Sequence, residues 1–222
     1  MWINEDKKLI YLCNPKCGSS TVRDQLKKQN FINLGPKQQK ICNGHWNHAP
    51  MKMIVNYLKI IGKNPYDYTY FTIIREPINR LISNFIYCQF DKDWNAFYSR
   101  NKTNALMDFS KEYNFTYNRK YNYTINDYIS FGLEKSNNLC THPMPIIDYS
   151  EILDERFNIF IFKLENMDDL KKFLEGFDII FDTNLNTNSR KYDGLKIRNT
   201  ITEKSIDKIH NIYKYEYTHY YK

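Results

Sequence analysis

Glycine and proline are scarce in this chain, with seven of each among 222 residues. Collagen-like sequences and glycine-rich low-complexity segments need far more of both, so these classes are excluded. Long hydrophobic runs are missing as well. Apolar runs such as residues 9–13 and 159–162 are far shorter than the roughly 20 apolar residues that cross a bilayer. The sequence therefore predicts a globular protein without a transmembrane helix.

Cysteine is also sparse and does not form a recognisable pattern. The chain has five cysteines, an odd number, and no two of them are separated by two residues. This argues against a zinc ribbon and against a disulfide framework, and it favours free, buried thiols in a reducing compartment. The first eight residues lack the apolar stretch of a signal peptide. We therefore expect no leader, no membrane anchor and a cytoplasmic location.

The charge balance indicates the kind of partner. There are 32 lysines and arginines against 25 acidic residues, which gives a formal net charge of +7. A basic surface favours an anionic partner, such as a nucleotide, an acidic glycan, a nucleic acid or a phospholipid. The basic residues are dispersed along the chain and form no block of like charge. Nucleic acid is therefore not the favoured partner.

Two strand–loop–helix units are visible in the hydrophobic pattern. Residues 9–13 form a continuous apolar run, typical of a strand buried on both faces, and a polar loop and a helix bearing Val22 and Leu26 follow. Residues 68–74 form a second such strand, and Pro77 suits the first position of the next helix. The expected apolar stripe of that helix is Ile78, Leu81, Ile82, Phe85 and Ile86.

The C-terminal part repeats this alternation. Residues 158–164 read as another buried strand, and residues 167–174 as a helix that ends at Gly176. A capping box at residues 200–203 predicts one final amphipathic helix. Alternating strands and helices predict an α/β fold with a parallel sheet. We expect a single domain over residues 1–222, with a variable insertion on the acceptor side at about residues 91–150.

The first loop has the chemistry of an anion cradle. It joins a buried strand to a helix N-terminus, where unpaired N–H groups and the helix dipole favour negative charge. Its residues are Pro15, Lys16, Cys17, Gly18, Ser19, Ser20 and Thr21. The lysine precedes the glycine and the loop is short, so it fits a Walker kinase loop poorly. A polar helix cap with a solvated lysine is the alternative interpretation.

A second loop supplies a candidate phosphate-binding pair. Arg75 stands at the end of the second strand, and Ser83 follows eight residues later on the next helix. Ligands of open parallel sheets bind outside the carboxyl ends of the strands, so both side chains are candidates for holding a phosphate. The alternative is a surface ion pair of Arg75 or Arg80 with Glu76, which leaves Ser83 without a function.

Together, the two loops resemble the nucleotide-binding segments of the sulfotransferases that use 3′-phosphoadenosine-5′-phosphosulfate (PAPS). Residues 15–21 resemble their 5′-phosphosulfate loop. Residues 71–85 resemble their 3′-phosphate motif, in the same order and with the same Arg-to-Ser spacing. The chain is most similar to the carbohydrate sulfotransferases of the heparan and chondroitin type. Weaker agreement extends to residues 162–165, to residues 188–190 and to the tyrosine-rich terminal helix.

The resemblance implies a P-loop-like three-layer fold, with a central parallel sheet flanked by helices, and a set of nucleotide contacts. It assigns the first loop to the 5′-phosphosulfate, and it assigns Arg75 and Ser83 to the 3′-phosphate. Ser189, with Arg190 or Lys191, would close over the nucleotide. The cosubstrate would be PAPS, the nucleotide product adenosine 3′,5′-bisphosphate, and no metal is expected. Unlike Golgi members of the family, the sequence shows no membrane anchor or stem.

The implied reaction moves a sulfuryl group in line to a hydroxyl acceptor, with a carbohydrate as the leading acceptor class. Lys16 would stabilise the charge on the leaving group. His45 matches the Gly-His pair that carries the base in heparan-type members, while His48 and His142 are further candidates and Glu76 is the carboxylate alternative. Two other functions stay open: a P-loop-like kinase, and a non-catalytic basic module that binds acidic glycan or nucleic acid.

Overall fold

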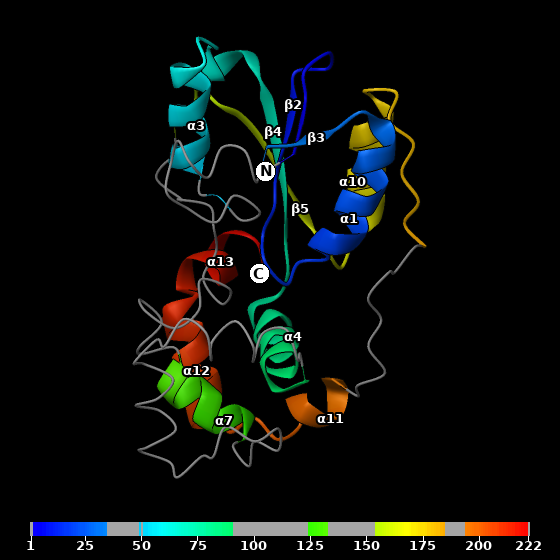
Figure 1. The fold of residues 1–222 in the computed structure, drawn as a ribbon. Helices are drawn as coiled ribbons and strands as arrows, with labels where there is room; N and C mark the ends of the chain where they lie inside the picture. Colours follow the sequence, from blue (N-terminus) through cyan, green and yellow to red (C-terminus); the bar gives the residue numbers. More distant parts are fainter. Residues whose placement is uncertain are drawn as a thin grey trace. The chain divides into compact units, whose positions relative to one another are not determined.

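The computed structural model describes residues 2–34, 49, 51–90, 124–132, 154–184 and 194–221. Its contacts divide the chain into two compact units, which are described separately below. The first unit contains residues 1–75 and 145–190, and the second contains residues 76–144 and 191–222. Figure 1 draws the elements of both. The single domain expected over residues 1–222 stays a prediction.

The first unit is built on a five-stranded sheet with the order β3-β1-β2-β4-β5. The strands are β1 (Trp2–Asn4), β2 (Leu9–Leu12), β3 (Ile32–Asn33), β4 (Thr69–Ile74) and β5 (Asn158–Lys163). The three strands β2, β4 and β5 are parallel, whereas β1 pairs antiparallel with both β2 and β3. This confirms the predicted α/β fold with a parallel centre. The two antiparallel strands were not predicted.

Helices cover both faces of this sheet. The helical segments of the first unit are α1 (Ser19–Leu26), η1 (Lys27–Gln29), α3 (Met51–Ile60), η3 (Pro65–Asp67) and α10 (Met167–Glu175). Helices α1 and α10 lie together on one side, and α3 lies on the other (Figure 1). Each side has its own hydrophobic cluster against the sheet. The buried β2 therefore has apolar side chains on both faces, as its sequence predicts.

The prediction for β5 was wrong on burial. Its residues are exposed or half-buried and none is fully buried, and Phe160 keeps 39% of its surface exposed. Among the described strands β5 pairs only with β4, so it forms one edge of the sheet. An apolar run of four residues, 159–162, cannot distinguish a central strand from a partly covered edge strand, since both bury some of their side chains.

The second unit is helical in its described part. Its elements are α4 (Pro77–Phe90), α7 (Ile125–Asp127), η4 (Tyr128–Gly132), α11 (Gly194–Arg198), α12 (Glu203–Ile212) and α13 (Lys214–His219). The predicted apolar stripe of α4 is buried along its whole length. It packs against Ile125, Ile129, Ile209 and Tyr213. The helix begins at Pro77, as the sequence predicts.

The terminal helix differs from its prediction at both its start and its middle. Thr202, not Thr200, is the N-cap: its hydroxyl accepts a hydrogen bond from the Ser205 N–H at 3.3 Å. The hydroxyl of Thr200 is used differently, because it donates to the carbonyl of Ile197 at 2.7 Å. The helix is also interrupted at Tyr213, whose backbone leaves the helical region and separates α12 from α13.

Most of the predicted insertion at residues 91–150 lies outside the described residues, and only residues 124–132 are described. Within the described ranges, no helix has both the length and the apolar character needed to cross a membrane.

Candidate functional site

The loop between β2 and α1 has an unusual backbone. Lys16 and Gly18 both adopt left-handed conformations, with φ of 60° and 73°. A lysine in this region is uncommon, since its Cβ crowds the backbone. Such conformations, alternating with ordinary ones as at Cys17, turn backbone N–H groups toward a common side, where they can bind an anion. Strained residues of this kind cluster at ligand-binding loops.

Helix α1 continues the loop with an N-terminus suited to negative charge. Gly18 is the N-cap and has no side chain to bond the first-turn N–H groups, and the first turn carries no acidic residue. A larger residue at Gly18 would be strained because the φ is positive, and its Cβ, 2.7 Å from Cδ1 of Leu164, would push the end of that side chain aside. The loop thus favours glycine at this position because of its backbone conformation.

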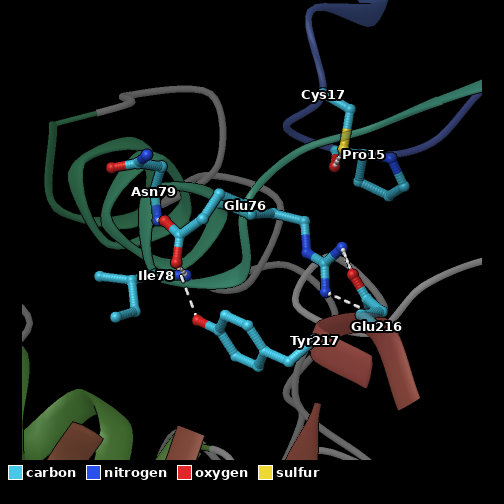
Figure 2. A network of polar contacts seen from close by, with 8 residues as sticks. Pro15, Cys17, Glu76, Ile78, Asn79, Glu216 and Tyr217 are labelled. Carbon is cyan, nitrogen blue, oxygen red and sulfur yellow. Dashed lines mark hydrogen bonds and ion pairs between the residues drawn. The ribbon is translucent and has the colours of Figure 1, made fainter. Parts of the chain in front are cut away.

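Two buried cysteines, Cys13 and Cys17, lie in the segment between β2 and α1. Cys17 is buried, and its thiol donates to the carbonyl of Pro15 at 3.3 Å (Figure 2). Burial raises the pKa of the Cys13 thiol, which keeps it protonated and unsuited to act as a nucleophile. Because the Cys17 thiol points to Pro15, the ligand contact predicted for Cys17 would come from its backbone.

Arg75 lies beside this loop. Strands β2 and β4 are parallel and adjacent, with Leu12 opposite Thr72, so both end at the same edge of the sheet. The Thr72 hydroxyl donates to the Leu12 carbonyl at 2.8 Å and ties the two strand ends together. From the end of β4, Arg75 Nη1 donates to the Lys16 carbonyl in a long hydrogen bond of 3.4 Å. The guanidinium therefore lies at the lysine-bearing turn.

No carboxylate among the described residues forms an ion pair with Arg75, which is half-buried. The surface ion pair considered as an alternative for Arg75 is thus not found within that part of the chain. The residues Lys16 and Arg75, with the N-terminus of α1, bring positive charge and N–H donors to one place. This arrangement can bind an anion.

For the other predicted site residues, proximity to this loop stays a prediction. Ser83 lies on the second turn of α4, half-buried, in the second unit, so its pairing with Arg75 stays a prediction. The remaining predicted residues lie outside the described ones: His45, His48, His142, Ser189 and Arg190.

Glu76 accepts hydrogen bonds that the sequence did not predict. One carboxylate oxygen accepts from the Ile78 N–H at 3.2 Å and from the Tyr217 hydroxyl at 2.8 Å. The other accepts from the Asn79 N–H at 2.8 Å and from Arg198 Nη1 at 3.2 Å. Figure 2 shows the Tyr217 hydroxyl pointing at this carboxylate. Four donors already occupy both oxygens, which argues against Glu76 as the catalytic base.

A second polar contact stabilises the same unit from within. Arg80 donates through both Nη atoms to the carboxylate of Glu216, at 2.7 and 2.8 Å, and both side chains are buried. The guanidinium also lies over the ring of Tyr213, 4.9 Å from its centroid. Burial raises the pKa of Tyr213 to about 12, and the Glu216 carboxylate contributes to the shift. Arg80 is therefore a core residue of the second unit.

Comparison with known proteins agrees with this chemistry. The model of the sulfotransferase family matches residues 1–222 of the chain. No curated protein and no solved structure was found to match it. Because the family match covers the whole sequence, the chain belongs to the sulfotransferase family and is a sulfuryl-transferring enzyme.

Proposed function

We propose that this member of the sulfotransferase family uses PAPS as its donor and transfers the sulfuryl group to a hydroxyl of a carbohydrate. The observation that carries the proposal is the contact of Arg75 Nη1 with the Lys16 carbonyl, at 3.4 Å. It brings a guanidinium to the loop that has a helix N-terminus and a lysine for binding phosphate. A donor nucleotide with phosphate groups at both its 5′ and 3′ positions needs two such cationic groups.

The donor's two ends are assigned to different parts of the site. The loop from Pro15 to Thr21 would bind the 5′-phosphosulfate through backbone N–H groups, the hydroxyls of Ser19, Ser20 and Thr21, and Lys16. Arg75 would hold the 3′-phosphate, and Ser83 would donate a hydrogen bond to it. Ser189 and Arg190 would close over the nucleotide. The half-buried position of Arg75 and the left-handed turn at Lys16 support this division.

The transfer is an in-line displacement at sulfur. The acceptor oxygen forms a bond to the sulfur as the bond from sulfur to the 5′-phosphate oxygen breaks, and adenosine 3′,5′-bisphosphate leaves with the electron pair. Lys16 stabilises the negative charge that grows on the bridging oxygen. His45 takes the proton of the acceptor hydroxyl, with His48 and His142 as the other candidates. Glu76 is not proposed for this role, because both of its oxygens are occupied.

The two other functions are less well supported. A P-loop-like kinase needs a lysine followed by serine or threonine at the end of the loop, whereas Lys16 stands near its beginning. A non-catalytic basic module would account for the net charge, but it would not account for a family match over residues 1–222.

A transfer assay tests the proposal directly. We expect label from PAPS carrying ³⁵S to appear on one member of a panel of oligosaccharides, and no label to be transferred from ATP carrying ³²P. In His45→Ala we expect transfer to be lost while adenosine 3′,5′-bisphosphate still binds. Full transfer by His45→Ala would move the role of base to His48 or His142. Transfer to no hydroxyl acceptor, with label moving from ATP, would refute the proposal.

A further inference from the structure

Arg23 lies one turn along α1 and folds back toward the start of the helix. Its Nη2 donates to the hydroxyl oxygen of Ser20 at 3.2 Å, and its Nε donates to the Ser19 carbonyl, also at 3.2 Å. The two contacts fix the guanidinium against the first turn. All three residues belong to the first unit, and the Arg23 side chain is half-buried.

This is an unfavourable place for a cation in the absence of a ligand. The N-terminus of a helix carries partial positive charge, so a nearby guanidinium raises the electrostatic energy. No acidic residue in the first turn of α1 offsets it. Lys16, in the preceding loop, adds a further positive charge. An anion bound at the helix N-terminus would offset this repulsion.

The hydrogen bond from Arg23 also determines whether the Ser20 hydroxyl donates or accepts toward a ligand. A serine hydroxyl has one hydrogen to donate and two lone pairs that accept. With Arg23 donating to one lone pair, the hydrogen of Ser20 points away from the guanidinium and is left for another acceptor. A charged donor on the oxygen also polarises the O–H bond and strengthens its donation to an anion. Among the described residues, no acceptor takes this hydrogen.

We propose that Arg23 is a positioning residue. By donating to the Ser20 oxygen, it orients the Ser20 hydroxyl so that this group donates its hydrogen to the 5′-phosphate end of the nucleotide. The inference rests on the proposed function, since it concerns the same anion site. Arg23 itself stays on the helix and acts through Ser20. Arg23 lies outside residues 15–21, which the family resemblance assigns to the 5′-phosphosulfate, and its role is inferred from its hydrogen bonds.

A double-mutant cycle tests the coupling, with the affinity for adenosine 3′,5′-bisphosphate measured by calorimetry. We expect Arg23→Ala and Ser20→Ala each to weaken binding by roughly tenfold, as expected for one hydrogen bond to a charged group. If Arg23 acts through Ser20, the double variant binds no more weakly than the weaker single variant. Losses that multiply, to about a hundredfold, would overturn the inference.

Controls separate this outcome from misfolding and from failure of the proposed function. Arg156→Ala removes an exposed arginine that pairs with Asp154 in the same unit, and it should leave binding unchanged. Arg23→Gln keeps an N–H donor, so partial recovery of affinity is expected if the hydrogen bond to Ser20 matters. Thermal unfolding of the unliganded variants checks that each is folded. If the wild-type protein does not bind the bisphosphate, the proposed function fails. If it binds but the losses multiply, only the role of Arg23 fails.

Discussion

Arg80 and Glu216 form a two-bond ion pair that is buried from solvent, although 136 residues separate them in the sequence. The pair joins α4 to α13, and the ring of Tyr213 packs against the guanidinium. A buried charge without its partner is costly, so each member depends on the other. The contact therefore links the C-terminal end of the chain to the helix that follows Arg75.

We predict that breaking this pair destabilises the protein strongly. Arg80→Met leaves the Glu216 carboxylate buried and uncompensated, and it should lower the free energy of unfolding by roughly 3–5 kcal/mol. The double variant Arg80→Met/Glu216→Met should lose less, because no buried charge remains. Denaturant unfolding measures both. Lys171→Met is the control, because its pair with Glu175 is exposed and 3.9 Å apart. A loss in Arg80→Met no larger than in this control would contradict the prediction.

Tyr213 should make stability fall at alkaline pH. Its pKa of about 12 in the folded protein lies above the ordinary value of 10.0, chiefly because the hydroxyl is buried. Between these two values the unfolded chain binds fewer protons than the folded one, so the free energy of unfolding falls as the pH rises. Two pKa units correspond to about 2–3 kcal/mol. The unfolding free energy of Tyr213→Phe should decline less between pH 10 and 12, and a decline as steep as in wild type would refute this.

Substitutions of Lys16 should separate the effect of its charge on turnover from the effect of its backbone conformation on stability. Lys16→Gly relieves the left-handed strain, worth roughly 1–2 kcal/mol, but gives the unfolded chain roughly 0.5–1 kcal/mol of extra freedom. Its thermal stability should therefore stay equal to wild type or rise slightly. Turnover should fall by about 10²–10³-fold in both Lys16→Gly and Lys16→Ala, since each removes the charge. Turnover near the wild-type rate in a folded variant would remove Lys16 from the transfer step.

Glu76 should matter for stability and not as a base. Glu76→Gln removes the negative charge that two backbone N–H groups, Tyr217 and Arg198 share, so we expect a loss of roughly 1–3 kcal/mol. At a temperature where the variant is folded, turnover should stay within a few-fold of wild type. Unfolding curves and initial rates measure the two effects. A loss of turnover of 10³-fold or more in the folded variant would identify Glu76 as catalytic.

The local pattern of the sequence predicts much of this fold. The strands β2 and β4 were recognisable because continuous apolar runs are typical of strands buried on both faces, and the stripe on α4 because its spacing is helical. Helix α3 was missed, although Met51, Ile54, Val55 and Leu58 have helical spacing and are buried. The antiparallel β1 and β3 have only three and two residues, too few for any period to be visible.

The site could be predicted only where neighbouring strands determine it. Parallel adjacent strands end at the same edge, so the proximity of the Lys16 loop and Arg75 follows from the fold class. The partners of Glu76 could not be found in the same way. Arg198 and Tyr217 lie 122 and 141 residues away, and no short pattern connects them with it. The contact of Arg23 with Ser20 has ordinary helical spacing, so its meaning became clear only beside the anion-binding loop.

The proposed function depends most on Arg75, which we propose recognises the 3′-phosphate of the donor nucleotide from the end of β4. Calorimetric titration with adenosine 3′,5′-bisphosphate and with AMP measures this directly, because the two ligands differ only in that phosphate. The wild-type protein should bind the bisphosphate roughly 10- to 100-fold more tightly, and Arg75→Ala should bind both ligands equally. Equal affinities in the wild-type protein, or a preference that survives in Arg75→Ala, would contradict the account.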